Sequence, residues 1–226
     1  LSFIKEMKNR DKIPVIEIPS FDVAKLKKDS KKLNENNKFL YFAKSFDVTI
    51  NIKNEGLIEK IDSLGSLWSL AIKSKDAYSL NLLFSKYIMP QGAELFIYSA
   101  DKTYVIGAFT NDNNNFNLNL ATSPVKGDNI VIELFEPNNV EFSSEIIIGS
   151  VNHDYLNIFK LLKDGQFGAS GDCNKDINCT EGSNWQNEKQ SVCRMIISGN
   201  GLCSGALINN TNNDGIPYFL TANHCY

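Results

Sequence analysis

The stretch YFLTANHCY (residues 218–226) and the stretch CSGALI (residues 203–208) carry the strongest signal in this 226-residue sequence. Both are short apolar runs typical of β-strands. His224, one of two histidines in the chain, directly follows the first run and directly precedes a cysteine. The pattern therefore predicts an imidazole at the end of a strand, with a cysteine beside it and another on a preceding strand.

These two stretches resemble the catalytic-histidine segment of trypsin-like serine proteases. CSGALI is similar to that family's Cys-x-Gly-x-Leu-Ile strand, and TANHCY is similar to the turn that carries the general base. The resemblance implies that His224 is the catalytic base and that Cys203 and Cys225 form a disulfide, which ties this turn to a neighbouring strand. It implies no cofactor. Clustered cysteines can instead bind zinc, but the sequence has no Cys-x-x-Cys pair and the gaps between its cysteines are long, so we predict disulfides and no metal ion.

The cysteine spacing narrows the resemblance. Counted from Gly168, four cysteines fall on the spacing found at the start of the mature enzyme in the bacterial lysyl endopeptidase family: Cys173, Cys179, Cys203 and Cys225. This close match covers about residues 168–226, and shorter segments upstream resemble the pro-regions that precede such catalytic domains. Cys193 is additional, and we expect it to pair outside this chain or to remain a buried thiol.

The resemblance implies that residues 168–226 contain the opening strands of a chymotrypsin-like β-barrel, over about 190–198, 202–208 and 216–221. The barrel would be incomplete, because the family's catalytic carboxylate and serine follow the histidine and no Gly-Asp-Ser-Gly segment occurs in the sequence. We therefore expect an interior piece of a longer precursor, inactive by itself. Cys173 and Cys179 would bond to cysteines further along that precursor.

The pattern of residues 1–155 predicts a mainly β fold, namely an antiparallel β-sandwich. We expect this sandwich to be the pro-region. Apolar alternation between turn signals predicts its strands, at Val48/Ile50/Ile52, Leu67/Trp68/Leu70/Ile72, Leu80/Leu82/Phe84, Leu95/Ile97, Val105/Ile106, Phe116/Leu118/Leu120, Ile130/Ile132/Leu134 and Ile146/Ile147/Ile148. A short helix capped by Ser20 is predicted over 21–33. Residues 156–167 are predicted to be a linker, with the maturation cut between Lys163 and Gly168.

Composition favours a folded, exported protein. Of the residues, 42% are hydrophobic and 22% charged, and no apolar run approaches the ~18 to 20 residues of a membrane helix. Residues 1–60 are basic but lack the stacking aromatics of a nucleic-acid reader. We therefore predict no nucleic-acid and no membrane partner. The cysteines and the resemblance together predict a secreted or periplasmic bacterial protein.

Three further features suggest other sites. Trp68, Tyr98 and Tyr104 could form a carbohydrate-binding face, although aromatic residues on alternating strands more often belong to the core. The Asn-rich run 111–115 has the composition of a calcium loop but not its residue order, so we predict a solvated hairpin tip. His153, beside Asp154, is interpreted as a local hydrogen-bonding residue.

The sequence thus predicts the precursor of a secreted serine endopeptidase that cleaves peptide bonds after lysine or another basic residue. Its partners would be a protein or peptide substrate and its own pro-region. Gln166-Phe167 stands before Gly168, where a self-releasing lysine-specific enzyme would have lysine. Cleavage by another protease, a cut elsewhere and a different specificity all remain open. The alternative function is a non-enzymatic β-sandwich module, binding carbohydrate or protein, fused to a degenerate protease-like domain.

Overall fold

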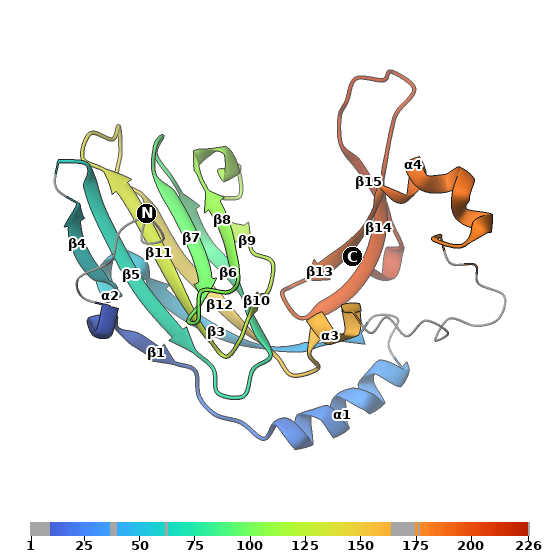
Figure 1. The fold of residues 1–226 in the computed structure, drawn as a ribbon, viewed down its shortest axis with the longest axis horizontal. Coiled ribbons are helices and arrows are strands. Elements are labelled where there is room, and N and C mark those ends of the chain that lie inside the picture. Colours follow the sequence, from blue (N-terminus) through green and yellow to red (C-terminus); the bar gives the residue numbers. More distant parts are fainter. Residues whose placement is uncertain (1–9, 37–39, 62, 164–174, 176, 226) are drawn as a thin grey trace. The chain divides into compact units, whose positions relative to one another are not determined.

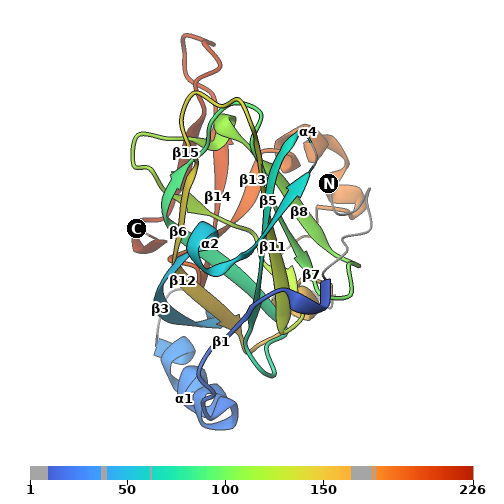
Figure 2. The ribbon, with the colours of Figure 1, turned by 90° about the vertical axis from the view of Figure 1, so that its left-hand side faces the viewer.

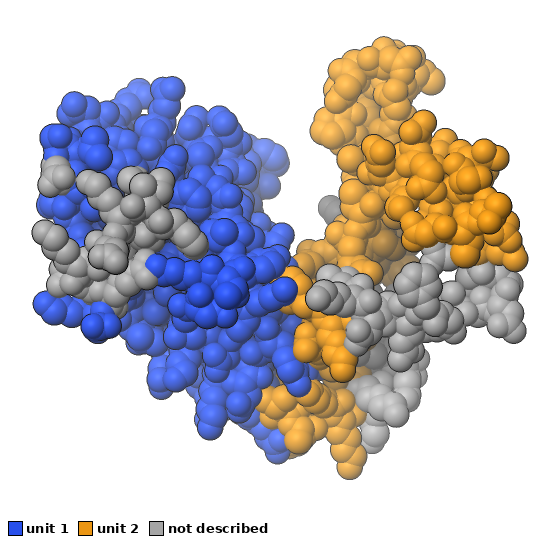
Figure 3. Space-filling model, in the orientation of Figure 1, with its two compact units in different colours: residues 1–22, 43–155 blue, residues 23–42, 156–226 orange. Residues whose placement is uncertain are grey.

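The computed structural model describes residues 10–36, 40–61, 63–163, 175 and 177–225. The chain divides into two compact units, each made of two stretches of sequence (Figure 3). Unit 1 comprises residues 1–22 and 43–155, and unit 2 comprises residues 23–42 and 156–226. The described secondary structure is mainly β, as predicted from the sequence.

Unit 1 is a β-sandwich of two sheets (Figures 1 and 2). The first sheet has the order β1-β5-β11-β7-β8, with β4 also paired to β5: β1 (Val15–Glu17), β4 (Leu57–Ile61), β5 (Gly65–Lys73), β7 (Glu94–Ser99), β8 (Val105–Phe109) and β11 (Asn129–Pro137). The second has the order β10-β6-β12-β3, with β9 beside β6: β3 (Ala43–Asn51), β6 (Ser79–Ile88), β9 (Leu120–Ala121), β10 (Val125–Lys126) and β12 (Glu145–Asp154). These pairs are antiparallel except β1 with β5.

The core of unit 1 lies between the two sheets. Alternate residues of the predicted strands point inward and pack as one cluster, which includes Leu70, Ile72, Leu95, Ile97, Ile130, Ile132 and Leu134 from the first sheet and Ile50, Leu80, Leu82, Phe84, Ile146, Ile148 and Val151 from the second. Burial of such side chains is the main favourable term in folding. The period-two pattern of the sequence therefore identified the sandwich correctly.

The strand predicted around Phe116 and Leu118 is wrong. A turn at Phe116 and Asn117 and a loop occupy most of this segment, and strand structure begins only at Leu120 in β9; the short helix η2 (Asn111–Asn113) lies just before it. The Thr110 side chain accepts a hydrogen bond from the Asp112 N–H, and Leu118 has a φ of 56°. At Phe116 itself, the Leu118 N–H donates to the Asn115 carbonyl oxygen at 3.0 Å, and this turn together with the left-handed backbone at Leu118 excludes a continuous strand.

Unit 2 contains an open sheet with the order β13-β14-β15 and with β2 beside β14. Its strands are β2 (Leu40–Tyr41), β13 (Val192–Ile197), β14 (Gly201–Ile208) and β15 (Tyr218–Thr221). The three strands predicted at the C-terminal end are thus confirmed. The sheet does not close into a barrel within the described residues.

Short helices make up the rest of the regular structure: η1 (Arg10–Lys12) and α2 (Ile52–Glu55) in unit 1, and α1 (Val23–Asn36), α3 (Ile158–Lys163), η3 (Thr180–Trp185), α4 (Gln186–Lys189) and η4 (Asn223–Cys225) in unit 2. The predicted helix is present as α1, but it begins at Val23, so Ser20 is too far upstream to cap it. Part of the predicted linker forms α3. The expected maturation site between Lys163 and Gly168 lies outside the described residues.

Candidate functional site

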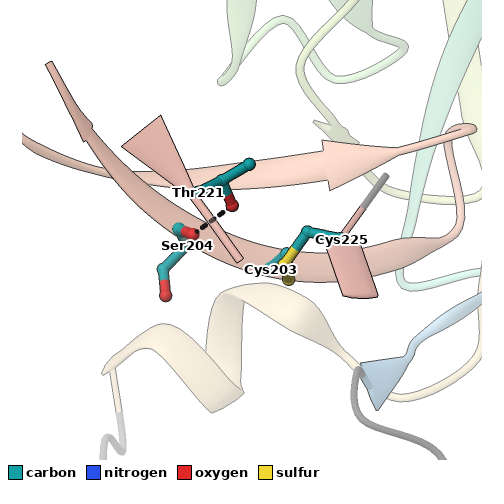
Figure 4. Close-up of a disulfide and its surroundings, with 4 residues drawn as sticks. All are labelled: Cys203, Ser204, Thr221 and Cys225. Atoms are coloured by element: carbon teal, nitrogen blue, oxygen red, sulfur yellow. Dashed lines mark hydrogen bonds between the residues drawn. A yellow bond between two sulfur atoms is a disulfide. The ribbon is translucent and has the colours of Figure 1, made fainter. Parts of the chain in front are cut away.

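The candidate site lies where β15 ends. Antiparallel pairing places Thr221 opposite Gly205 of β14. The chain then turns through η4, in which the Cys225 N–H donates to the Ala222 carbonyl oxygen at 2.9 Å. This turn brings Cys225 back toward β14, where it forms a disulfide with Cys203 (Figure 4). Their Cα atoms are 6.0 Å apart, within the range of ordinary disulfides.

The disulfide anchors the turn that bears His224. One ring nitrogen of His224 and the two sulfur atoms all lie within 4.8 Å of one another. Cys225 is buried and Cys203 half-buried, whereas His224 is exposed. The backbone of the turn is therefore held to β14 while the imidazole remains open to solvent. A general base needs both properties, because it must be positioned and must also meet the group whose proton it takes.

A side-chain hydrogen bond reinforces the base of the turn. The Thr221 hydroxyl donates to the Ser204 carbonyl oxygen at 2.8 Å (Figure 4). Ser204 is itself exposed. The covalent bond at Cys203 and this hydrogen bond at the next residue connect the same two segments, so the turn is held at two neighbouring positions.

Gly205 allows the strands at this point to come close together. A Cβ atom at position 205 would lie 2.4 Å from Cε1 of Phe219 and 2.5 Å from the Leu220 carbonyl oxygen. Neither distance is compatible with a real side chain, and the second involves backbone that cannot rotate away. The glycine in CSGALI is therefore explained by packing of β14 against β15, two residues from the bonded Cys203.

Cys203, His224 and Cys225 are the one group of potential metal ligands that the described residues bring together. Zinc binds cysteine as the thiolate. Both sulfurs are here bonded to each other, which leaves the imidazole as the sole ordinary ligand. The geometry therefore favours the disulfide over a metal site.

The other cysteines are not bonded within the described residues. Cys179 has an exposed thiol, and the half-buried thiol of Cys193 donates to the Ser191 carbonyl oxygen at 3.5 Å. Cys173 lies outside the described residues. The predicted bonds of Cys173 and Cys179 to cysteines further along a precursor stay predictions.

The second histidine has a structural environment. His153 in β12 is fully buried, with its Nδ1 2.8 Å from the Ser74 hydroxyl oxygen and the Phe21 ring packed edge-on against it. Burial lowers the pKa of His153 from its ordinary value of 6.5 to about 4. The predicted hydrogen-bonding role is confirmed, but the prediction of a local partner is wrong, since Ser74 lies 79 positions away in the sequence. The neighbouring Asp154 accepts instead from the Ser79 hydroxyl at 2.7 Å.

The suggested carbohydrate-binding face is wrong. Trp68 and Tyr98 are 9% and 2% exposed, and Tyr104 packs against the core of the sandwich. The Tyr98 hydroxyl donates to a buried Glu133 oxygen at 2.7 Å. Trp68 and Tyr98 are therefore unavailable to a ligand, and the half-buried Tyr104 does not form a face with them, in agreement with the usual place of aromatic residues on alternating strands.

The Asn-rich run lies in an exposed connection between β8 and β9, and because these strands belong to different sheets the predicted hairpin is wrong, although the predicted exposure is confirmed. The Asn114 side chain accepts from the Met89 N–H at 3.0 Å and donates to the Met89 carbonyl oxygen at 2.9 Å. The Asn113 side chain accepts from the Thr110 N–H. Asn113 and Asn114 thus satisfy nearby backbone, which gives no support for an ion site.

Comparison with known proteins agrees with the C-terminal geometry. Residues 167–226 match the family described as lysyl endopeptidase, C-terminal domain. We call residues 167–226 the lysyl endopeptidase segment after this match. The chain is also 32% identical over 114 residues to a lysyl endopeptidase of Pseudomonas aeruginosa. That match covers 46% of this chain and 24% of the relative, so the matched stretch spans about a quarter of the relative's length.

No solved structure gives a significant match to the chain. The described helices include none that is long and apolar enough to span a membrane. Within the lysyl endopeptidase segment, the structure brings together the three residues singled out from the sequence, Cys203, His224 and Cys225. The pairing of β2 with β14 in the sheet of this segment was not predicted from the sequence. The one sequence feature that could have indicated this strand is the short apolar run FLYF (residues 39–42).

Proposed function

We propose that this chain is part of the precursor of a secreted serine endopeptidase of the trypsin-like type. Residues 1–163 would form a removable pro-region, and the lysyl endopeptidase segment would begin the catalytic domain. The observation that supports this function most strongly is His224, exposed on a turn that the Cys203–Cys225 disulfide ties to β14.

His224 would act as general base and general acid in turn. A neutral imidazole accepts the proton of a serine hydroxyl as that oxygen attacks the peptide carbonyl, and then gives the proton to the departing amine. The serine, the carboxylate that orients the imidazole and the oxyanion hole would come from other parts of the precursor. The disulfide keeps the base at the required place, because small displacements of a catalytic group cost large factors in rate.

Exposed apolar side chains on the sheet of unit 2 favour the proposal that this sheet is part of a larger catalytic domain. Leu207 and Leu220 are 46% and 62% exposed, and the register places them on opposite faces of the sheet, since Leu220 lies opposite Ala206. Val192 on β13 is also 62% exposed. Apolar side chains exposed on both faces of one sheet are unfavourable in water. We propose that further parts of the catalytic domain cover both faces.

The substrate would be a protein or peptide, cut after lysine or another basic residue. This preference rests on the name of the relative. The chain's own pro-region would be a second partner, with no nucleic acid or membrane involved. The protein would be exported from a bacterial cell, since structural disulfides persist in oxidising compartments.

The test compares the full-length precursor with residues 1–226. Both are assayed against a lysine ester and a lysine amide, together with matched alanine substrates. The matured full-length protein should hydrolyse the lysine substrates, whereas residues 1–226 should give the buffer rate. Turnover by residues 1–226 would contradict the proposed division of the active site. A full-length protein without hydrolytic activity would favour the non-enzymatic alternative, a β-sandwich module fused to a degenerate protease-like domain.

A further inference from the structure

A short strand from the proposed pro-region is part of the sheet that carries the candidate site. Within unit 2, β2 pairs antiparallel with the start of β14, with Leu40 opposite Leu202 and Tyr41 opposite Gly201. The Phe42 N–H extends the ladder by donating to the Asn200 carbonyl oxygen at 2.9 Å. Residues 23–42 accordingly group with residues 156–226 as one compact unit (Figure 3).

The position of β2 along β14 is specific. β13 pairs with one edge of β14 over residues 201–206, so β2 and β15 must share the other edge. β15 covers that edge from Gly205 onward and β2 covers it at Gly201 and Leu202. Between them lie Cys203 and Ser204, where the disulfide and the Thr221 hydrogen bond hold the turn of His224. The strand β2 thus occupies the edge directly beside this turn.

The contact between β2 and β14 is made through main-chain hydrogen bonds. An extended segment that adds to a sheet edge gains affinity from main-chain hydrogen bonds. An open edge also presents unpaired N–H and C=O groups that can pair with other chains. Because β2 lies within the same chain as β14, its effective concentration is high and a short ladder is enough to keep it bound.

We propose that residues 40–42 are the docking strand through which the pro-region binds the catalytic segment, and that their partner is Asn200 together with the edge of β14 at Gly201 and Leu202. The assignment of these residues to a pro-region rests on the proposed function. While attached, the strand covers the edge of β14 next to Cys203 and protects it from pairing with other chains. Removal of the pro-region uncovers this edge.

The register specifies which amides the contact protects. Successive N–H groups of a strand point to opposite edges. Since the Phe42 N–H faces β14, the Leu40 N–H also faces it and pairs with Leu202, whose own N–H points back to β2. The N–H of Cys203 then points to β13. Leu202 therefore reports on β2, and Cys203 is an internal control on the same strand.

The experiment is residue-resolved hydrogen exchange on the intact chain of residues 1–226. Leu40→Pro removes the N–H donor, and Leu40→Ala is the matched control that shortens the side chain but keeps the donor. Loss of one such hydrogen bond should speed exchange at Leu202 about tenfold in Leu40→Pro. Leu40→Ala should leave it near the unmodified rate, and Cys203 should not change in either variant. Unchanged exchange at Leu202 in a folded Leu40→Pro protein would overturn the proposal.

The unmodified chain provides a second measurement that needs no variant. The amides of Leu202 and Phe42 should both exchange far more slowly than in an unstructured peptide, and exchange of either at the unstructured rate would overturn the docking strand even if Leu40→Pro failed to fold. Neither measurement depends on proteolysis or activity. If the Leu202 amide is protected but the precursor is never processed, the contact between β2 and β14 is confirmed and only the proposed maturation is wrong.

Discussion

Lowering the pH should destabilise unit 1 through His153. Because burial lowers the pKa of this imidazole from 6.5 to about 4, the unfolded chain binds its proton between these two values while the folded chain does not. The unfolded state then binds more protons, so stability falls as the pH falls. The contribution is fully present above about pH 6.5 and is lost as the pH drops toward 4. For this difference in pKa between the folded and unfolded chain, the free energy of unfolding should be ~3 kcal/mol lower at pH 4 than at neutral pH.

Urea unfolding of residues 1–226 at pH 7.5 and at pH 4, followed by tryptophan fluorescence, measures this loss. His153→Gln retains a polar side chain near Ser74 but cannot be protonated. The variant should be less stable at pH 7.5, yet its stability should fall less between the two pH values, by ~3 kcal/mol. The charged side chains that act on His153, namely Asp76, Lys44 and Asp128, are common to both proteins. Equal losses in the two proteins would refute the reasoning.

Three other changes test the C-terminal segment and its maturation. Cys225→Ser removes the disulfide, which joins residues 22 apart, and should lower the free energy of unfolding by ~3 kcal/mol on the chain-entropy estimate. It should also lower the activity of the matured enzyme. Peptide mapping that found both thiols free in the unmodified secreted enzyme would contradict this prediction. Gly205→Ala should destabilise the sheet by ~1 to 3 kcal/mol, since the new methyl group meets the Leu220 carbonyl oxygen, and an unchanged urea midpoint would show that β14 and β15 can separate. N-terminal sequencing of the secreted enzyme should place the cut between Lys163 and Gly168, and a mature chain that starts at Asp164 would indicate cleavage after lysine. A fully active enzyme that keeps residues 1–163 would rule out an inhibitory pro-region.

Features set by local pattern were predictable from the sequence. The strands that became β13, β14 and β15 have short apolar runs of the right length, and the core residues of the sandwich alternate with period two. The pairing of Cys203 with Cys225 came from the resemblance to a protease segment, since five cysteines by themselves allow several connectivities.

Features set by distant partners were not predictable. β2 is two residues long, and its partner Leu202 is more than 160 positions away, so no local pattern separates it from a loop. Phe116 and Leu118 have the alternation of a strand, but the Asn115 side chain accepts from the Asn117 N–H and donates to the Asn119 carbonyl oxygen, so the chain turns here. The Ser74 partner of His153 depends on the sandwich bringing β12 beside the end of β5. For β2 and for Ser74 tertiary contacts decide the outcome, whereas at Phe116 and Leu118 local side-chain hydrogen bonds override the alternation.

The central claim is that His224 is the general base of an endopeptidase, and the kcat/KM of full-length variants toward a lysine ester tests it most directly. His224→Ala should lower kcat/KM by several orders of magnitude, about the loss seen when a catalytic histidine is removed from other serine proteases. The control Asn223→Ala changes the exposed neighbour on the same turn, and His153→Gln changes the second histidine; both should stay within about threefold of the unmodified enzyme. An active enzyme whose kcat/KM is unaffected by His224→Ala would contradict the account.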